Sequence, residues 1–269
     1  MTTPDKTRLA EDVGSLEIFG TPFSTFTRSI TMGLEEMGLG GHYIQHPFTP
    51  HSAEVKKRNP LGLLPVLIHR PDAIYTSAEN AVVLFESNAV RRYLDDFVYP
   101  TVSRHGKNQH ALTPPLPGHG TTQDGVLLAQ AAEARARVDQ WVSMASSTLF
   151  QNVEFGVVKP RLAMEKNGAD DATVYTALEG NIDKMHAVLS KLEDLAKRDP
   201  TPFLCGSEIT WADLFLYPAL ADLRATPQGD VIRGSDARFP WIAAWSDRMD
   251  ARPSAKSTYE GTLASQRKK

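Results

Sequence analysis

Residues 59–68 read Asn-Pro-Leu-Gly-Leu-Leu-Pro-Val-Leu-Ile, an apolar run with a proline inside it. Proline within a central strand removes a hydrogen bond of the sheet, so Pro65 needs a structural reason. A cis peptide bond between Leu64 and Pro65 would give a tight turn before the strand. It would also leave the Leu64 amide and carbonyl free to pair with an extended peptide. The stretch therefore predicts a turn, a strand and a peptide-binding edge.

A second segment, residues 81–90, reads Ala-Val-Val-Leu-Phe-Glu-Ser-Asn-Ala-Val. Its first five residues are apolar and predict a strand, and Glu86-Ser87 then opens a helix. A hydroxyl group and unpaired amides at the positive end of a helix suit a bound carboxylate. The segment therefore predicts a binding site for an acidic group at Ser87.

The residues before these segments predict alternating strands and helices. Residues 15–20 predict a strand and 42–46 a second strand parallel to it. Between them a helix should start near Ser24 and stop at the glycines of 38–41, with one apolar side formed by Ile30, Leu34 and Met37. This order is that of a thioredoxin-like domain, which we place at 15–98 after an N-terminal tail at 1–14.

The second half of the chain has helical periodicity. Residues 99–124 are dense in proline and glycine and predict a linker without helix or strand. An all-helical domain at 125–258 and a C-terminal tail at 259–269 should follow. One helix face is predicted at Leu178, Ile182, Met185, Leu189, Leu192 and Leu195. Thr210 and Asp213 have the spacing of a capping box, so we interpret Asp213 as structural and not catalytic.

Composition excludes several functions. A net charge of −3 over 269 residues gives no basic face for nucleic acid. Cys205 is the only cysteine, the first residues lack the apolar core of a signal peptide, and no run of about 20 apolar residues is present. We therefore expect a cytoplasmic protein without a membrane partner. His105, His110 and His119 have no metal-site spacing, and no metal is expected.

The Asn-Pro-x-Gly-x-x-Pro segment and the Glu-Ser pair resemble the glutathione transferase superfamily. The resemblance implies a fold with an N-terminal thioredoxin-like domain followed by a C-terminal all-helical bundle. It also implies glutathione as cosubstrate and a homodimer. In that family the residues matching Leu64 and Pro65 hold the cysteinyl unit of glutathione. Those matching Glu86 and Ser87 hold its γ-glutamyl end.

Residues 22–28, Pro-Phe-Ser-Thr-Phe-Thr-Arg, resemble the serine-type transferases, especially the phi class. The resemblance implies that Ser24 is the catalytic residue and contacts the glutathione sulfur. A free thiol has a pKa of roughly 8.5 and is mostly protonated at neutral pH, so a catalyst must favour the thiolate. A hydroxyl at a helix N-terminus can do so. Thr25 is the alternative donor, and a helix cap is the alternative role for Ser24.

The two remaining parts of the site are less specific. His51, with Lys56 and Lys57 after it, resembles the family's ligands for the glycyl carboxylate, although His51 is one residue closer to Asn59 than in the phi class. We expect a pocket for a hydrophobic electrophile between the domains. The loop at 23–26 would face a helix with Trp141, Met144, Leu149 and Phe150, although Trp141 and Leu149 also fit an ordinary core.

Three functions are compatible with these motifs. The first is a glutathione transferase, a detoxification enzyme that attacks a hydrophobic electrophile. The second is a glutathione-dependent β-aryl-etherase, because residues 51–57 and 245–254 are also similar to bacterial etherase-type proteins. The third, from a different class, is a non-catalytic binding protein with the same fold.

Overall fold

The computed structural model of the chain describes residues 12–71, 81–104, 111–116 and 125–267. The sequence predicts a connection at 69–80 that is far longer than a usual hairpin loop, and most of it lies outside this range, as do His105, His110 and His119. Within the range, no helix is long and apolar enough to cross a membrane.

The N-terminal half is built on a four-stranded sheet with the order β2-β1-β3-β4. The strands are β1 (Ser15–Phe19), β2 (Tyr43–His46), β3 (Val66–Arg70) and β4 (Val82–Phe85). β1 and β2 are parallel, whereas β3 is antiparallel to both β1 and β4. The predicted thioredoxin-like order of strands and helices is confirmed.

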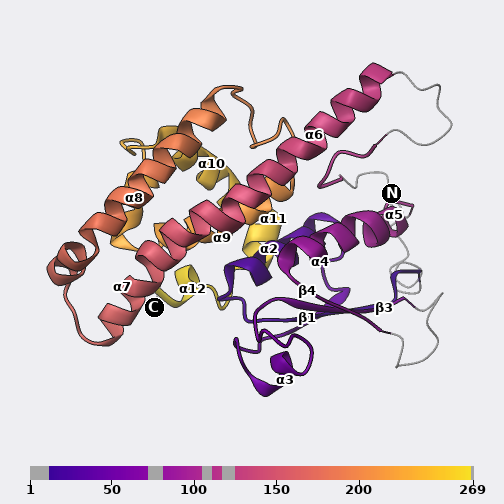
Figure 1. Ribbon diagram of the computed structural model, residues 1–269, viewed down its shortest axis with the longest axis horizontal. Coiled ribbons are helices and arrows are strands. Elements are labelled where there is room, and N and C mark those ends of the chain that lie inside the picture. Colours follow the sequence, from indigo (N-terminus) through magenta and orange to yellow (C-terminus); the bar gives the residue numbers. More distant parts are fainter. Residues whose placement is uncertain (1–11, 72–80, 105–110, 117–124, 268–269) are drawn as a thin grey trace.

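Three helices cover the two faces of this sheet (Figure 1). α2 (Thr25–Glu36) and α4 (Ser87–Tyr93) lie between the sheet and the helical half. α3 (Ala53–Lys56) lies on the opposite face, where Val55 packs against Phe19 and Val66. The alternation of side chains along each strand separates the two cores, because neighbouring residues point to opposite faces.

α2 follows its sequence prediction closely. It begins after Ser24, whose hydroxyl caps the helix, and its predicted apolar side of Ile30, Leu34 and Met37 is fully buried. Gly38 follows with a φ of 80°, a backbone conformation that glycine adopts easily and that ends the helix.

The helix that begins at Ser87 continues into the segment predicted to be a linker without helix. α4 continues through a wide turn, η2 (Leu94–Val98), into α5 (Tyr99–Val102), so the expected linker at 99–124 begins with helix. Pro100 lies inside this continuous helical stretch and has no amide hydrogen to donate to the preceding turn. Val98 and Val102 are both buried, so packing supports the helix across the proline.

The second half is all-helical, as predicted. Its elements are α6 (Gly125–Met144), η3 (Ala145–Leu149), η4 (Gln151–Val158), α7 (Lys159–Lys166), α8 (Asp171–Lys197), α9 (Trp211–Arg224), η5 (Pro227–Ile232), α10 (Pro240–Asp250), α11 (Pro253–Ser257) and α12 (Leu263–Arg267). The predicted face of α8 is buried, except that Leu195 is half-buried. The expected C-terminal tail at 259–269 instead contains α12, because Leu263 packs into the core.

α9 is the central helix and packs against α2 of the first half. Gly33 in α2 allows this close approach, because a Cβ atom there would overlap the Trp211 ring. The predicted capping box at Thr210 and Asp213 is present. The Asp213 carboxylate is completely buried and accepts hydrogen bonds from the Thr210 and Leu204 amides and from Trp245 Nε1, each at 2.9 Å. These contacts agree with a structural role.

Candidate active site

The sheet register brings the predicted site segments to one edge. Phe19, the last residue of β1, pairs with Val66, the first residue of β3, and Val66 pairs with Phe85, the last residue of β4. The loop to Ser24 leaves the sheet just after Phe19. Leu64-Pro65 enters just before Val66, and Glu86-Ser87 follows Phe85 directly. Three segments far apart in sequence therefore meet at the same end of the sheet.

The peptide bond between Leu64 and Pro65 is cis, as predicted. Asn59 holds the turn before it, donating from Nδ2 to the Leu63 carbonyl and accepting from the Leu61 amide, both at 3.0 Å. The Leu64 amide and carbonyl make no hydrogen bond to any residue that the structure describes. Both groups are thus available to an extended ligand laid along this edge.

His51 lies against the same turn. Its amide donates to the Gly62 carbonyl at 2.7 Å, and a Cβ atom on Gly62 would meet the imidazole. His51 itself has a φ of 63° and an exposed side chain. Lys56 and Lys57 are exposed at the end of α3, and Lys57 pairs with Glu54. Among His51, Lys56 and Lys57, His51 is therefore the basic residue that contacts the turn before Pro65.

Ser24 and Thr25 differ in exposure. Ser24 is half-buried at the N-terminus of α2, whereas Thr25 is only 7% exposed. Ser24 Oγ accepts a long hydrogen bond of 3.4 Å from the Thr27 amide. A hydroxyl oxygen can accept one hydrogen bond and still donate its own proton. The cap and a catalytic role for Ser24 are therefore compatible.

Glu86 has a strained backbone, with a φ of 68° and a ψ of 110°. A non-glycine residue rarely takes this conformation, which costs of order 1–3 kcal/mol and is typical of functional sites. The Glu86 carbonyl accepts hydrogen bonds from the Ala89 and Val90 amides, and Ser87 is the first residue of α4. The amides at this helix start precede the first hydrogen-bonded turn and can bind an anion.

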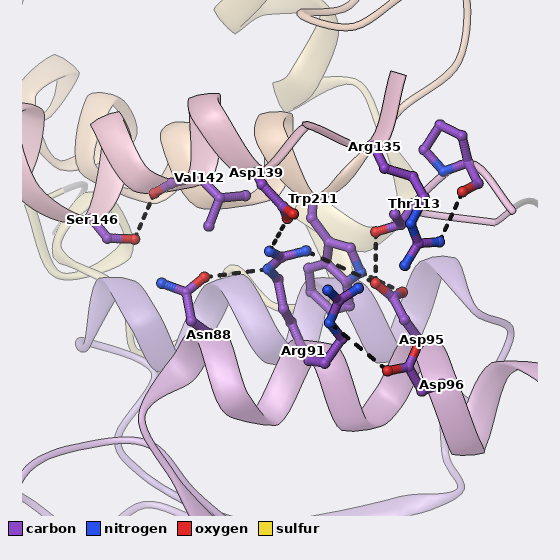
Figure 2. Close-up of polar contacts among 12 residues, drawn as sticks. Asn88, Arg91, Asp95, Asp96, Thr113, Arg135, Asp139, Val142, Ser146 and Trp211 are labelled. Atoms are coloured by element: carbon purple, nitrogen blue, oxygen red, sulfur yellow. Dashed lines mark hydrogen bonds and ion pairs between the residues drawn. The ribbon is translucent and has the colours of Figure 1, made fainter. Parts of the chain in front are cut away.

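A buried polar network ties α4 to the helical half, as Figure 2 shows. Arg91 donates to Asp139 of α6 and to Asn88 Oδ1, and lies 4.0 Å from Asp95. Asp95 in turn accepts from Trp211 Nε1 of α9 at 2.7 Å. The sequence prediction missed this network. The spacing of Arg91 and Asp95 indicates a helical ion pair, but nothing local identifies their partners on other helices.

Burial raises the pKa of two further side chains, Asp95 and Cys205. Desolvation raises the pKa of the Asp95 carboxyl, although Thr113 and Trp211 donate to it. Desolvation also raises the pKa of the half-buried Cys205 thiol to about 12. Cys205 is therefore a poor thiolate nucleophile. No cluster of metal-binding side chains occurs among the described residues.

An aromatic cluster adjoins Ser24. The rings of Phe26 and Phe150 lie 4.5 Å apart between centroids, and Phe155 packs edge-on against Phe150 at 5.1 Å. Phe155 is 51% exposed. Trp141 and Leu149 are buried in the core, which favours their structural interpretation.

Comparison with known proteins identifies the family. The model of the N-terminal domain of glutathione S-transferases matches residues 23–96, and that of the C-terminal domain matches residues 175–248. Together they match more than half of the chain. The chain belongs to the glutathione S-transferase superfamily. The N-terminal match contains all six residues predicted for the glutathione site.

This transferase is similar to plant proteins over nearly its whole length. A probable glutathione S-transferase GSTF1 of Oryza sativa subsp. japonica is 23% identical over 90% of this chain and 94% of its own. Glutathione S-transferase F7 of Arabidopsis thaliana is 24% identical over 91% of this chain and 99% of its own. The crystal structure of glutathione transferase F7 from Populus trichocarpa matches with a TM-score of 0.65 and 22% identity. The match covers 91% of this chain and 98% of the Populus chain.

Proposed function

We propose that this glutathione transferase binds glutathione along the edge of the sheet and activates its thiol through Ser24. The observation that carries the proposal is the register that brings Ser24, Leu64-Pro65 and Glu86-Ser87 to one edge. The unpaired Leu64 backbone would pair with the cysteinyl unit. Ser87 would bind the γ-glutamyl carboxylate and Glu86 its ammonium group. His51 would bind the glycyl carboxylate.

The activation that Ser24 must supply is modest. Lowering the thiol pKa by about two units requires about 2.7 kcal/mol of preferential stabilisation of the thiolate. A hydroxyl that donates to the sulfur makes a charge-assisted hydrogen bond, and the N-terminus of α2 adds a favourable dipole. These two contributions together are of the required size.

The electrophile pocket belongs to the same proposal. Phe26 lies in the first turn of α2, close to Ser24, and its ring contacts that of Phe150. Phe150 in turn contacts Phe155 of η4, whose ring is exposed. Such a surface favours hydrophobic and aromatic electrophiles, because rings pack edge-on or offset against one another.

The kinetic test compares Ser24→Ala with Thr25→Val. Removing the Ser24 hydroxyl should lower kcat/KM for chlorodinitrobenzene about 100-fold, the effect of losing one donor to a developing anion. Thr25→Val removes the neighbouring hydroxyl at similar volume and should leave kcat/KM within a few-fold. The reverse pattern would assign the chemistry to Thr25.

The same variants should be assayed with a β-aryl ether. Turnover of the ether but not of chlorodinitrobenzene would identify an etherase. Retention on immobilised glutathione without turnover of any electrophile would identify a binding protein and contradict the proposed activity.

We also propose that the transferase is a homodimer, as its family resemblance implies. Val126, Leu127 and Leu128 are exposed in the first turn of α6, which projects from the body of the molecule in Figure 1. Exposed apolar side chains of this kind favour burial by a second copy. Sedimentation equilibrium should give twice the mass of the chain.

A further inference from the structure

A lysine side chain lies over the aromatic cluster that adjoins Ser24. The Lys159 ammonium group is 4.5 Å from the centre of the Phe155 ring and 5.0 Å from that of the Phe150 ring. Phe150 in turn contacts Phe26 of α2, with 4.5 Å between the ring centroids. The proposed electrophile pocket therefore has a positive charge on its apolar wall, beside the ring that is exposed.

The geometry of the helix places Lys159 over these rings. Phe150 directly precedes η4 and Phe155 lies within it. This stretch is a π-helix, whose hydrogen bonds from residue i to residue i+5 bring side chains five positions apart to the same side. Lys159 begins α7 four residues after Phe155 and shares that side. The faces of aromatic rings attract a cation, so the cluster holds the ammonium group close to it.

The charge of Lys159 is available to a ligand. Lys159 is exposed and makes no ion pair within the described part of the chain. Glu154 and Asp222 attract it electrostatically, but both are buried, and burial is the main cause that raises the pKa of each carboxyl group, that of Asp222 to about 7. Protonation near neutral pH thus removes a substantial part of the negative charge behind Lys159.

An acidic group on a ligand would compete well for this ammonium group. The contact of an exposed lysine with a ring is weak, whereas a carboxylate accepts a charge-assisted hydrogen bond from it. The lysine side chain is long and flexible, and its three donors can turn from the rings toward such a group. The aromatic part of the ligand would then pack against the rings that the ammonium group leaves.

We infer that Lys159 makes the pocket selective for aromatic electrophiles that carry an acidic group, such as a carboxylate. The inference rests on the proposed transferase function, because it names the substrate class of the same pocket. The ring would pack against Phe26 and Phe150, with its reacting carbon toward the glutathione sulfur at Ser24. The carboxylate would accept a hydrogen bond from Lys159, which takes no part in the bond-making step.

A matched pair of substrates tests this selectivity: 4-chloro-3,5-dinitrobenzoate and its methyl ester. In both reactions the thiol proton is released to solvent, and the thiolate forms a C–S bond at the carbon that bears chlorine. The C–Cl bond breaks, and chloride leaves with the bonding electron pair. The substrates differ in the charge of the group opposite the chlorine. The ratio of their kcat/KM values, acid to ester, therefore measures recognition of the carboxylate.

Lys159→Met should lower this ratio about tenfold, which corresponds to about 1.4 kcal/mol. Lys159→Arg keeps the positive charge and should retain most of the ratio. Lys166→Met is the matched control, because Lys166 is exposed at the other end of α7, and it should leave the ratio unchanged. An unchanged ratio in Lys159→Met, or an equal fall in Lys166→Met, would overturn the inference.

Calorimetric titration with the glutathione conjugates of the two substrates, prepared chemically, separates this inference from the proposed function. Lys159→Met should weaken binding of the acidic conjugate about tenfold and that of the ester conjugate much less. This result without turnover of either substrate would contradict the proposed activity and support selection by Lys159. Turnover of both substrates, with no effect of Lys159→Met in either measurement, would overturn the inference and leave the proposed activity supported.

Discussion

Glu86 and Arg91, at the start of α4 and within it, are each energetically unfavourable for a different reason. Glu86 takes an unfavourable backbone conformation where α4 begins, and Arg91 is a buried charge whose side chain is 7% exposed. A buried charge is costly unless it is paired and hydrogen-bonded. Asp139 and Asn88 accept hydrogen bonds from Arg91 and Asp95 lies 4.0 Å from its Nη1, although Nη1 has no hydrogen-bond partner among the described residues. Arg91 thereby fixes the position of the helix whose first turn carries Ser87.

Arg91→Lys should therefore weaken glutathione binding more than chemistry. Lysine keeps the charge but cannot reproduce the fork of donors that contacts several partners at once. We expect KM for glutathione to rise about tenfold, equivalent to about 1.4 kcal/mol, with a smaller change in kcat. Arg92→Lys is the matched control, because Arg92 is exposed on the same helix. Equal effects of the two variants in steady-state kinetics would contradict this positioning role.

Helices and strands with strong local signals were predictable from sequence. α2 has a capping serine, a regular apolar side and a stop at Gly38, all within its own residues. The helical stretches at 99–102 and 263–267 were missed, because prolines and polar residues argue locally against them. Burial of Val102 and Leu263 in the tertiary structure outweighs that local preference.

The contact of α2 with α9 depends on Gly33. Gly33→Ala should destabilise the protein by about 1–3 kcal/mol, because the added methyl group overlaps the Trp211 ring and overpacks the contact. Gly180→Ala is the matched control, since Gly180 is exposed on α8 with no atom near the added group, and it should stabilise by up to about 1 kcal/mol. Urea unfolding measures both. Stabilisation by Gly33→Ala would contradict this close packing.

Across the whole molecule, the sequence predicts the segments of the candidate site better than the polar contacts between elements that surround them. Leu64-Pro65 and Glu86-Ser87 are short motifs that depend on local geometry, and the sheet register then brings them together. The network at Arg91 joins residues from several elements. Such a set has no periodicity or spacing in the sequence, so only the tertiary structure reveals it.

A buried carboxyl group at the centre of the molecule predicts a pH dependence of stability. Burial raises the Asp222 pKa from 3.8 to about 7, although Arg28 and Lys159 oppose the rise. Between these values the folded state binds more protons than the unfolded state, so this group's contribution to stability falls as pH rises and is lowest above about 7. Asp222→Asn should remove this dependence.

Urea unfolding at pH 5 and pH 8 checks the Asp222 prediction. The gain in stability of Asp222→Asn over the unmodified protein should be larger at the higher pH. Asp236→Asn, at an exposed position, should show no such difference. A gain from Asp222→Asn that is independent of pH would contradict the raised pKa.

The pKa of bound glutathione tests most directly whether Ser24 activates the thiol. It is measured from the ultraviolet absorbance of the thiolate as the complex is titrated with base. The pKa should lie about two units below the roughly 8.5 of a free thiol in the unmodified protein and in Thr25→Val. In Ser24→Ala it should return most of the way to the free value. An unchanged low pKa in Ser24→Ala, with glutathione still bound, would contradict activation by Ser24.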